Sequence, residues 1–283
     1  KYDFTWVLIA FSLLGISNTI LQVSLNPLIA ALFTKEKTAS VLTTGQFVKS
    51  ISSLLGPVLA GVAVTVFGDW KMAFTLFSAI SVLSIVLLSF ATTNEFAFNT
   101  SQTSFRSVMG LLKERNILFS FLSIMLIVGL DVGLNTIAPE LLMKKVGLEL
   151  SRAGLGSSVY FFAKIAGTFV GALMLLKTAP LRFLKISLLI AVFAFIPLML
   201  LSELWVLIVA IFLIGFMCAN VFSIIFSFAL QNKTERSNEI SALMIMGVSG
   251  GAVILPLQGY VNDIFGLTAS ISILMISLLC ILL

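Results

Sequence analysis

The sequence has few of the residues that carry charge or metal chemistry in water. Only 10% of its 283 residues are charged, histidine is absent, and the two cysteines, Cys218 and Cys280, lie inside apolar stretches. The absence of histidine excludes the usual histidine metal sites and a histidine general base. Two cysteines placed in this way do not form a disulfide framework. We therefore expect neither a metal nor a cofactor.

Apolar residues make up 59% of the chain, and its mean hydropathy is +1.16. A soluble domain has about 45–50% apolar and about 25% charged residues, so this chain has too little polar surface for water. A helix that crosses a bilayer needs about 20 apolar residues. Nine such windows, bounded by Gly, Pro, Asn or charged turns, cover 5–33, 41–67, 71–93, 117–139, 153–177, 183–202, 204–230, 238–261 and 265–283. The sequence predicts an all-α, polytopic membrane protein.

Basic residues are unevenly divided between the two sides of the predicted membrane. The loops after the first, third, fifth and seventh windows hold ten of them: Lys35, Lys37, Arg106, Lys113, Arg115, Lys177, Arg182, Lys185, Lys233 and Arg236. The opposite side holds Lys1, Lys71, Lys144, Lys145 and Arg152. The positive-inside rule places the larger set in the cytoplasm. We expect an inner-membrane protein whose chain starts outside and ends inside, with no nucleic-acid partner.

The two ends of the chain indicate a fragment. The chain starts at Lys1-Tyr2-Asp3 without a methionine, ends in an apolar run at Leu283, and has an odd number of windows. We expect further helices before Lys1.

A polar stretch, 94–115, separates residues 1–93, with three windows, from residues 116–283, with six. We interpret it as a cytoplasmic linker between two bundles. Its second half has apolar residues at helical spacing, Phe105, Val108, Met109 and Leu112, which predicts an amphipathic helix on the membrane surface. A short helix packed on the protein is the alternative.

Polar residues interrupt several windows along single helix faces. The first window carries Asn18, Gln22 and Asn26, and the second carries Gln46 and Lys49. The fourth, fifth and seventh carry, in pairs, Asp131 and Asn135, Tyr160 and Lys164, and Asn220 and Gln231. Such groups must face protein or a water-filled cavity. The stripes recur every three windows, which indicates repeated three-helix units.

The two lysines inside windows are unfavourable unless a partner or a function compensates, because each costs about 2.5–3.5 kcal/mol at the bilayer centre. Asp131 and Lys164 lie at similar depths, roughly 12–15 Å from the outer side at 1.5 Å per residue, so we expect them to pair. Lys49 has no acid at similar depth in this chain. We expect each lysine to lie in a cavity, where it contacts the substrate or a coupling acid. The alternative is a structural lysine that binds backbone carbonyls at a helix end.

Several segments resemble the fucose permease branch of the major facilitator superfamily. They are Leu21-Gln22, Asn26-Pro27-Leu28, Gly45-Gln46-Phe47 and Gly56-Pro57, then Gly129-Leu130-Asp131-Val132, Ala163-Lys164-Ile165-Ala166-Gly167-Thr168, Ile225-Phe226-Ser227 with Leu230-Gln231-Asn232, Gly250-Gly251-Ala252, and Pro256-Leu257-Gln258-Gly259. The resemblance implies helices four to twelve of a twelve-helix fold. Two positions depart from the proton-coupled fucose permease, with Gln22 in place of Glu and Lys49 in place of Asn. Because Gln22 cannot titrate, this position cannot couple protons.

The resemblance implies uptake of a hexose-type sugar by alternating access at a site near the middle of the membrane, as a monomer, with H+ or Na+ as the coupling ion. Amides suit sugar hydroxyls because both donate and accept hydrogen bonds. We expect substrate contacts from Gln22, Asn26, Gln46, Lys49, Asn135 and Asn220. Asp131 and Lys164 form a charge pair that the substrate or a coupling cation breaks. Asn18, Gln231 and Tyr160 are further candidates, with the Tyr160 ring stacking on the sugar.

Two other functions remain open at this point. An exporter of drugs or other small solutes would have a more apolar cavity with fewer amides. An intramembrane enzyme acting on lipid-linked substrates would need converging acids, bases or metal ligands, which this composition does not offer.

Overall fold

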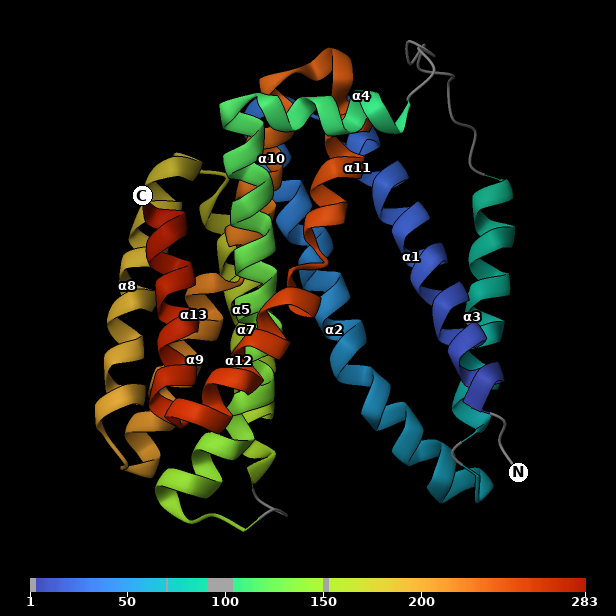
Figure 1. Ribbon diagram of the computed structural model, residues 1–283. Helices are drawn as coiled ribbons and strands as arrows, with labels where there is room; N and C mark the ends of the chain where they lie inside the picture. The colour runs from blue at the N-terminus through green and yellow to red at the C-terminus, as the bar shows by residue number, and fades with distance from the viewer. Residues whose placement is uncertain (1–3, 70, 91–103, 150–152) are drawn as a thin grey trace. The chain divides into compact units, whose positions relative to one another are not determined.

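The computed structural model describes residues 4–69, 71–90, 104–149 and 153–283, and the regular structure in these ranges is helical (Figure 1). The first ten residues of the predicted linker, together with Lys1 and Arg152, lie outside the described residues. The helices of the predicted first three windows are α1 (Phe4–Leu32), α2 (Lys35–Phe67) and α3 (Met72–Ser89). The short elements α4 (Phe105–Gly110) and η1 (Leu111–Lys113) follow.

The remaining windows correspond to α5 (Arg115–Val146), α7 (Leu155–Met174), α8 (Pro180–Leu200), α9 (Leu204–Cys218) with α10 (Val221–Asn232), α11 (Ser237–Gly247) with α12 (Gly250–Phe265), and α13 (Leu267–Leu282). The short helix η2 (Thr234–Arg236) precedes α11. Within the described residues, six helical stretches are long and apolar enough to cross a bilayer, and Met72–Leu87 and Leu267–Leu282 are shorter apolar helices.

Two of the predicted windows are broken rather than continuous. The window 204–230 divides into α9 and α10 at Ala219 and Asn220, and 238–261 divides into α11 and α12 at Val248 and Ser249. At the second break Gly250 lies against α5, and a Cβ added there would be 1.9 Å from the carbonyl oxygen of Met125. Small residues in membrane helices allow two backbones to approach this closely.

The chain forms two compact units, Lys1–Phe47 with Thr103–Leu283, and Val48–Gln102, so α2 contributes to both. The predicted division into two bundles, residues 1–93 and residues 116–283, stays a prediction.

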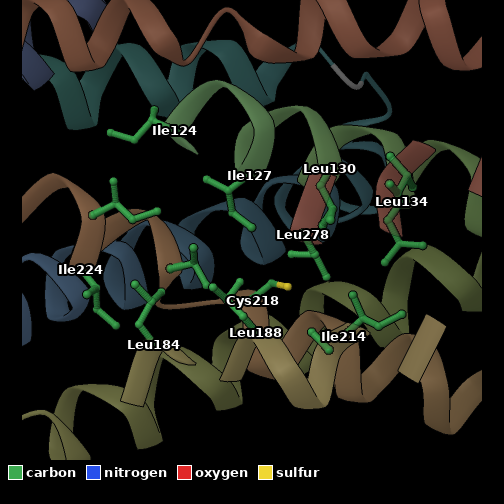
Figure 2. Close-up of a cluster of buried hydrophobic side chains, with 14 of the residues drawn as sticks. Ile124, Ile127, Leu130, Leu134, Leu184, Leu188, Ile214, Cys218, Ile224 and Leu278 are labelled. Carbon is green, nitrogen blue, oxygen red and sulfur yellow. The ribbon is translucent and has the colours of Figure 1, made fainter. Parts of the chain in front are cut away.

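The core of the first unit surrounds α5, which contacts α7, α9, α10, α11, α12 and α13. Figure 2 shows Leu130 and Leu134 of α5 among Leu188 of α8, Ile214 of α9 and Leu278 of α13. These five side chains are almost completely buried. The core therefore fixes the orientation of α5, and with it the polar face that α5 presents to α7.

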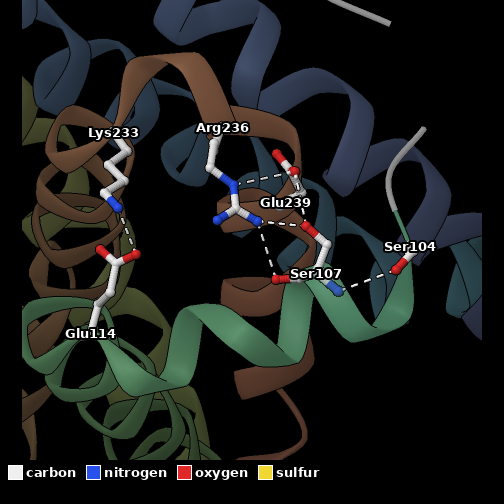
Figure 3. A network of polar contacts seen from close by, with 6 residues as sticks. All are labelled: Ser104, Ser107, Glu114, Lys233, Arg236 and Glu239. Atoms are coloured by element: carbon white, nitrogen blue, oxygen red, sulfur yellow. Dashed lines mark hydrogen bonds and ion pairs between the residues drawn. The ribbon is translucent and has the colours of Figure 1, made fainter. Parts of the chain in front are cut away.

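The described end of the predicted linker packs on the protein. Val108 and Leu111 are buried, while Phe105 is exposed. Figure 3 shows Arg236 at the end of η2, whose Nη2 donates to Ser107 Oγ at 2.6 Å, and Lys233 Nζ paired with Glu114 Oε1 at 2.6 Å. The Nε of Arg236 lies 3.4 Å from Glu239 Oε1. These contacts fit the alternative of a short packed helix.

Candidate functional site

The described polar residues meet where α5 crosses α7. Asp131 lies near the middle of α5, and Asn135 is one turn further on the same face; Lys164 lies near the middle of α7, one turn after Tyr160. Ser157, one turn before Tyr160, donates its hydroxyl to the backbone oxygen of Asn135 at 3.0 Å. Three residues on successive turns of α7 thus lie along one polar face of α5.

Both carboxylate oxygens of Asp131 accept hydrogen bonds from α7. The hydroxyl of Tyr160 donates to Oδ1, and the ammonium of Lys164 forms an ion pair with Oδ2. The Lys164 nitrogen also lies 5.9 Å from the centroid of the Tyr160 ring, within the range of a cation–π contact. Asp131 and Lys164, which were predicted to pair because they lie at similar depths, are therefore in contact. Tyr160 contacts both of them.

Burial differs among these three side chains. Tyr160 is 1% exposed, whereas the side chains of Lys164 and Asp131 keep 19% and 29% of their surface. The stacking role expected for Tyr160 does not fit this burial, because no ring face is open to a ligand. The hydroxyl of Tyr160 instead binds the carboxylate of Asp131.

Asn135 brings an unused acceptor to the same cluster. Its Oδ1 is buried and accepts no hydrogen bond from the described residues. A buried acceptor without a donor is unfavourable, so a water molecule or a ligand hydroxyl is the group that suits this position.

Asn220 lies between α7 and α10 in this conformation. Its Nδ2 donates to the carbonyl of Gly167 at 2.9 Å, and the residue is 2% exposed. A Cβ added at Gly171 would lie 2.2 Å from Nδ2, so the amide fills the space that this glycine leaves. Asn220 therefore joins two helices here, and its Oδ1 accepts no bond from the described residues. Gln231, further along α10, donates to Ser227 Oγ at 2.8 Å.

The predicted residues of α1 occupy different environments. Asn18 is exposed, whereas Gln22 and Asn26 are half-buried. Between them, the carbonyl of Val23 accepts a hydrogen bond from Ser241 of α11 at 3.2 Å. This contact brings the Gln22 and Asn26 turns of α1 to α11.

The predicted residues of α2 fall on both sides of the boundary between the units. Gln46 is half-buried beside Phe47, whose ring centroid lies 5.4 Å from that of Phe169 on α7. Lys49 is exposed and belongs to the second unit.

The cluster of Asp131, Asn135, Tyr160 and Lys164 thus combines predicted residues from two helices. Two contacts that sequence reasoning missed are those of Ser241 with Val23 and of Ser40 with Ala172, where Ser40 Oγ donates to the carbonyl at 2.8 Å. Serines are common in these helices, so their spacing gives no signal that separates these two.

Comparisons with known proteins identify the family. A putative glucose/galactose transporter of Helicobacter pylori (strain ATCC 700392 / 26695) is 26% identical over 270 residues, which cover 88% of this chain and 64% of that protein. A glucose/galactose transporter of Brucella abortus biovar 1 (strain 9-941) is 22% identical over 270 residues, covering 88% and 63%. The chain spans less than two thirds of the length of these curated relatives.

Solved structures give the fold. FucP, a major facilitator transporter in the outward conformation, matches with a TM-score of 0.80 at 17% identity, over 93% of this chain and 71% of that one. A second structure of FucP, the E. coli fucose:proton symporter, matches with a TM-score of 0.83 at 17% identity, over 93% and 72%. These matches confirm the predicted all-helical fold.

The family model of the Major Facilitator Superfamily matches residues 2–256, most of the chain. This match confirms the predicted resemblance to this superfamily and the prediction of a multi-pass membrane protein. Because the family consists of transporters, the alternative of an intramembrane enzyme is set aside. The chain belongs to the Major Facilitator Superfamily.

Proposed function

We propose that the natural protein containing this chain takes up a hexose-type sugar by alternating access, coupled to H+ or Na+. The observation that carries the proposal is the polar cluster of Asp131, Asn135 and Lys164 halfway along two membrane helices. Charged groups at that depth are unfavourable in lipid, so their exposed surface calls for a hydrated space. The names of the relatives, glucose/galactose transporters, support a hexose as the substrate.

Amides recognise the sugar in this proposal. A hexose presents hydroxyls that both donate and accept, and an amide offers one acceptor and two donor hydrogens. The unused Oδ1 of Asn135 is an acceptor for such a hydroxyl. The predicted contact residues are Gln22, Asn26, Gln46, Lys49, Asn135 and Asn220, with Asn18 and Gln231 as further candidates. Asn220 can contribute only after its bond to Gly167 opens, since it is buried here.

The Asp131–Lys164 pair links the site to an ion in this proposal. It lies one turn from Asn135, so a sugar bound at the amide lies next to the charges. Substrate or a coupling cation separates the pair, and the return of Lys164 follows release. The protein works as a monomer in the inner membrane, with the first residue of this chain outside and the last in the cytoplasm.

Contacts of α1 and α2 with later helices support alternating access. The carbonyls of Val23 on α1 and Ala172 on α7 accept bonds from Ser241 and Ser40, respectively. The basic residues Lys35 and Lys37 lie in the first turn of α2. The positive-inside rule therefore assigns these contacts to the cytoplasmic half. A site closed on that side is one of the two states that alternating access requires.

Uptake of labelled hexoses by cells that express the natural protein tests the proposal. We expect Asn135→Ala, Gln22→Ala and Asn26→Ala each to raise KM for the sugar several-fold, because one amide contact is lost. Ser272→Ala is the matched control, since its hydroxyl bonds Thr268 within its own helix. Unchanged KM in all three variants at equal expression contradicts the site, and extrusion instead of accumulation favours the exporter.

A further inference from the structure

The two groups that bind Asp131 differ in their freedom to leave it. Tyr160 is 1% exposed, and its ring is enclosed by the protein, so its hydroxyl stays at Oδ1. The side chain of Lys164 keeps 19% of its surface exposed, and a flexible four-carbon stem carries its ammonium. The ammonium is therefore the exchangeable donor, and the tyrosine is the fixed one.

The ammonium also occupies the place that another cation would need. Oδ1 is taken by Tyr160, and Oδ2 faces Lys164. A small monovalent cation that approaches Asp131 meets a positive charge already in contact with the carboxylate, and like charges repel at that distance. Such a cation binds only when Lys164 moves away.

The surroundings offer few other charges that could take over this role. Three further ion pairs, Lys144–Glu140, Lys233–Glu114 and Arg236–Glu239, lie near helix ends. The titratable groups near the carboxylate are Tyr160 and Lys164 of α7 and the buried Cys218 thiol at the end of α9.

We propose that Lys164 is a tethered competitor that sets the affinity of Asp131 for the coupling cation. This inference rests on the proposed function. The lysine holds the carboxylate neutralised while no cation is bound, and it lowers the apparent affinity for H+ or Na+ by the strength of its own ion pair. It thereby prevents Asp131 from remaining loaded when the cation concentration is low.

Replacement of the lysine by a neutral residue tests the proposal. In Lys164→Gln we expect half-saturation of sugar uptake by the coupling cation at a concentration about two- to fivefold lower than in the wild type, the factor that a partly exposed ion pair represents. Na+ is varied at fixed pH, and pH is varied at fixed Na+, so that the two arms identify the cation. Lys164→Arg keeps the charge and is expected to keep the wild-type half-saturation. An unchanged or higher half-saturation in Lys164→Gln in both arms overturns the proposal.

A binding measurement covers variants that fold but do not transport. The melting temperature of the purified natural protein in detergent is followed while Na+ or pH is varied. We expect Lys164→Gln to respond at lower cation concentration than the wild type, and Asp131→Asn/Lys164→Gln to lose that response. Identical responses in all three proteins overturn the proposal. If the wild type takes up no hexose, the proposed function fails, and this measurement still tests competition at Asp131.

Discussion

At the scale of single residues, Tyr160 illustrates how burial changes a role that spacing suggests. Its position one turn before Lys164 correctly indicates the polar face of α7, but periodicity contains no information about the depth of a ring within that face. The structure encloses the ring and leaves its hydroxyl as a donor to Asp131. The pairing of Asp131 with Lys164 could be inferred from sequence because depth along two helices can be counted. The unused Oδ1 of Asn135 could not, since it depends on neighbours from other helices.

The Tyr160→Phe substitution tests this positioning role. Loss of the hydroxyl leaves Asp131 Oδ1 without its fixed donor, and a hydrogen bond to a charged group contributes about 1.5–3 kcal/mol. We expect a lower melting temperature of the purified natural protein. Tyr260→Phe, the same chemical change at an exposed tyrosine of α12, is the control and should leave the melting temperature unchanged. Equal melting temperatures for the two variants would show that the hydroxyl does not hold the carboxylate.

At the scale of helices, hydropathy predicts that a helix exists better than it predicts whether the helix is continuous. Each of the nine apolar windows corresponds to described helices, because a bilayer requires about 20 apolar residues for each crossing. The breaks at Asn220 and at Ser249 escape such windows, since apolar residues flank both. The structure shows that Gly250, at the second break, lies against the backbone of Met125.

Gly250 and Gly259, both on α12, form a matched pair for testing this close approach. A Cβ at Gly250 would meet the Met125 carbonyl of α5, whereas a Cβ at Gly259 would meet nothing within 4 Å. We expect Gly250→Ala to lower the free energy of unfolding by about 1–3 kcal/mol, the usual cost of overpacking. Gly259→Ala should be neutral or stabilising, by up to about 1 kcal/mol, because alanine favours helix. Denaturation of both variants in detergent measures the difference, and equal destabilisation contradicts the crossing.

At the scale of the whole molecule, the contacts of α1 and α2 within the first unit gather at one end. Every α1 residue from Phe4 to Leu21 is exposed, while the segment after it is partly buried. On α2, Thr38, Ser40 and Thr43 are all buried near its start. Apolar packing, such as that of Phe47 on Phe169, and weak hydroxyl bonds to backbone carbonyls make these contacts. Bonds of this kind open without stranding a charge, which suits a gate that opens in every cycle.

Covalent closure of this contact should stop transport. In a Cys218→Ala/Cys280→Ala background, we expect oxidation of Ser40→Cys with Ala172→Cys to abolish sugar uptake, because α2 can no longer leave α7, and reduction to restore it. The control pair, Glu140→Cys with Asn262→Cys, joins α5 to α12 where Glu140 Oε1 accepts from Asn262 Nδ2 at 2.9 Å. Both helices of the control lie in the predicted C-terminal bundle, 116–283. Because the members of one bundle move together in the proposed alternating access, this cross-link should leave uptake intact. Full uptake by the cross-linked Ser40–Ala172 variant would mean that the two helices stay together throughout the cycle and that the gate lies elsewhere.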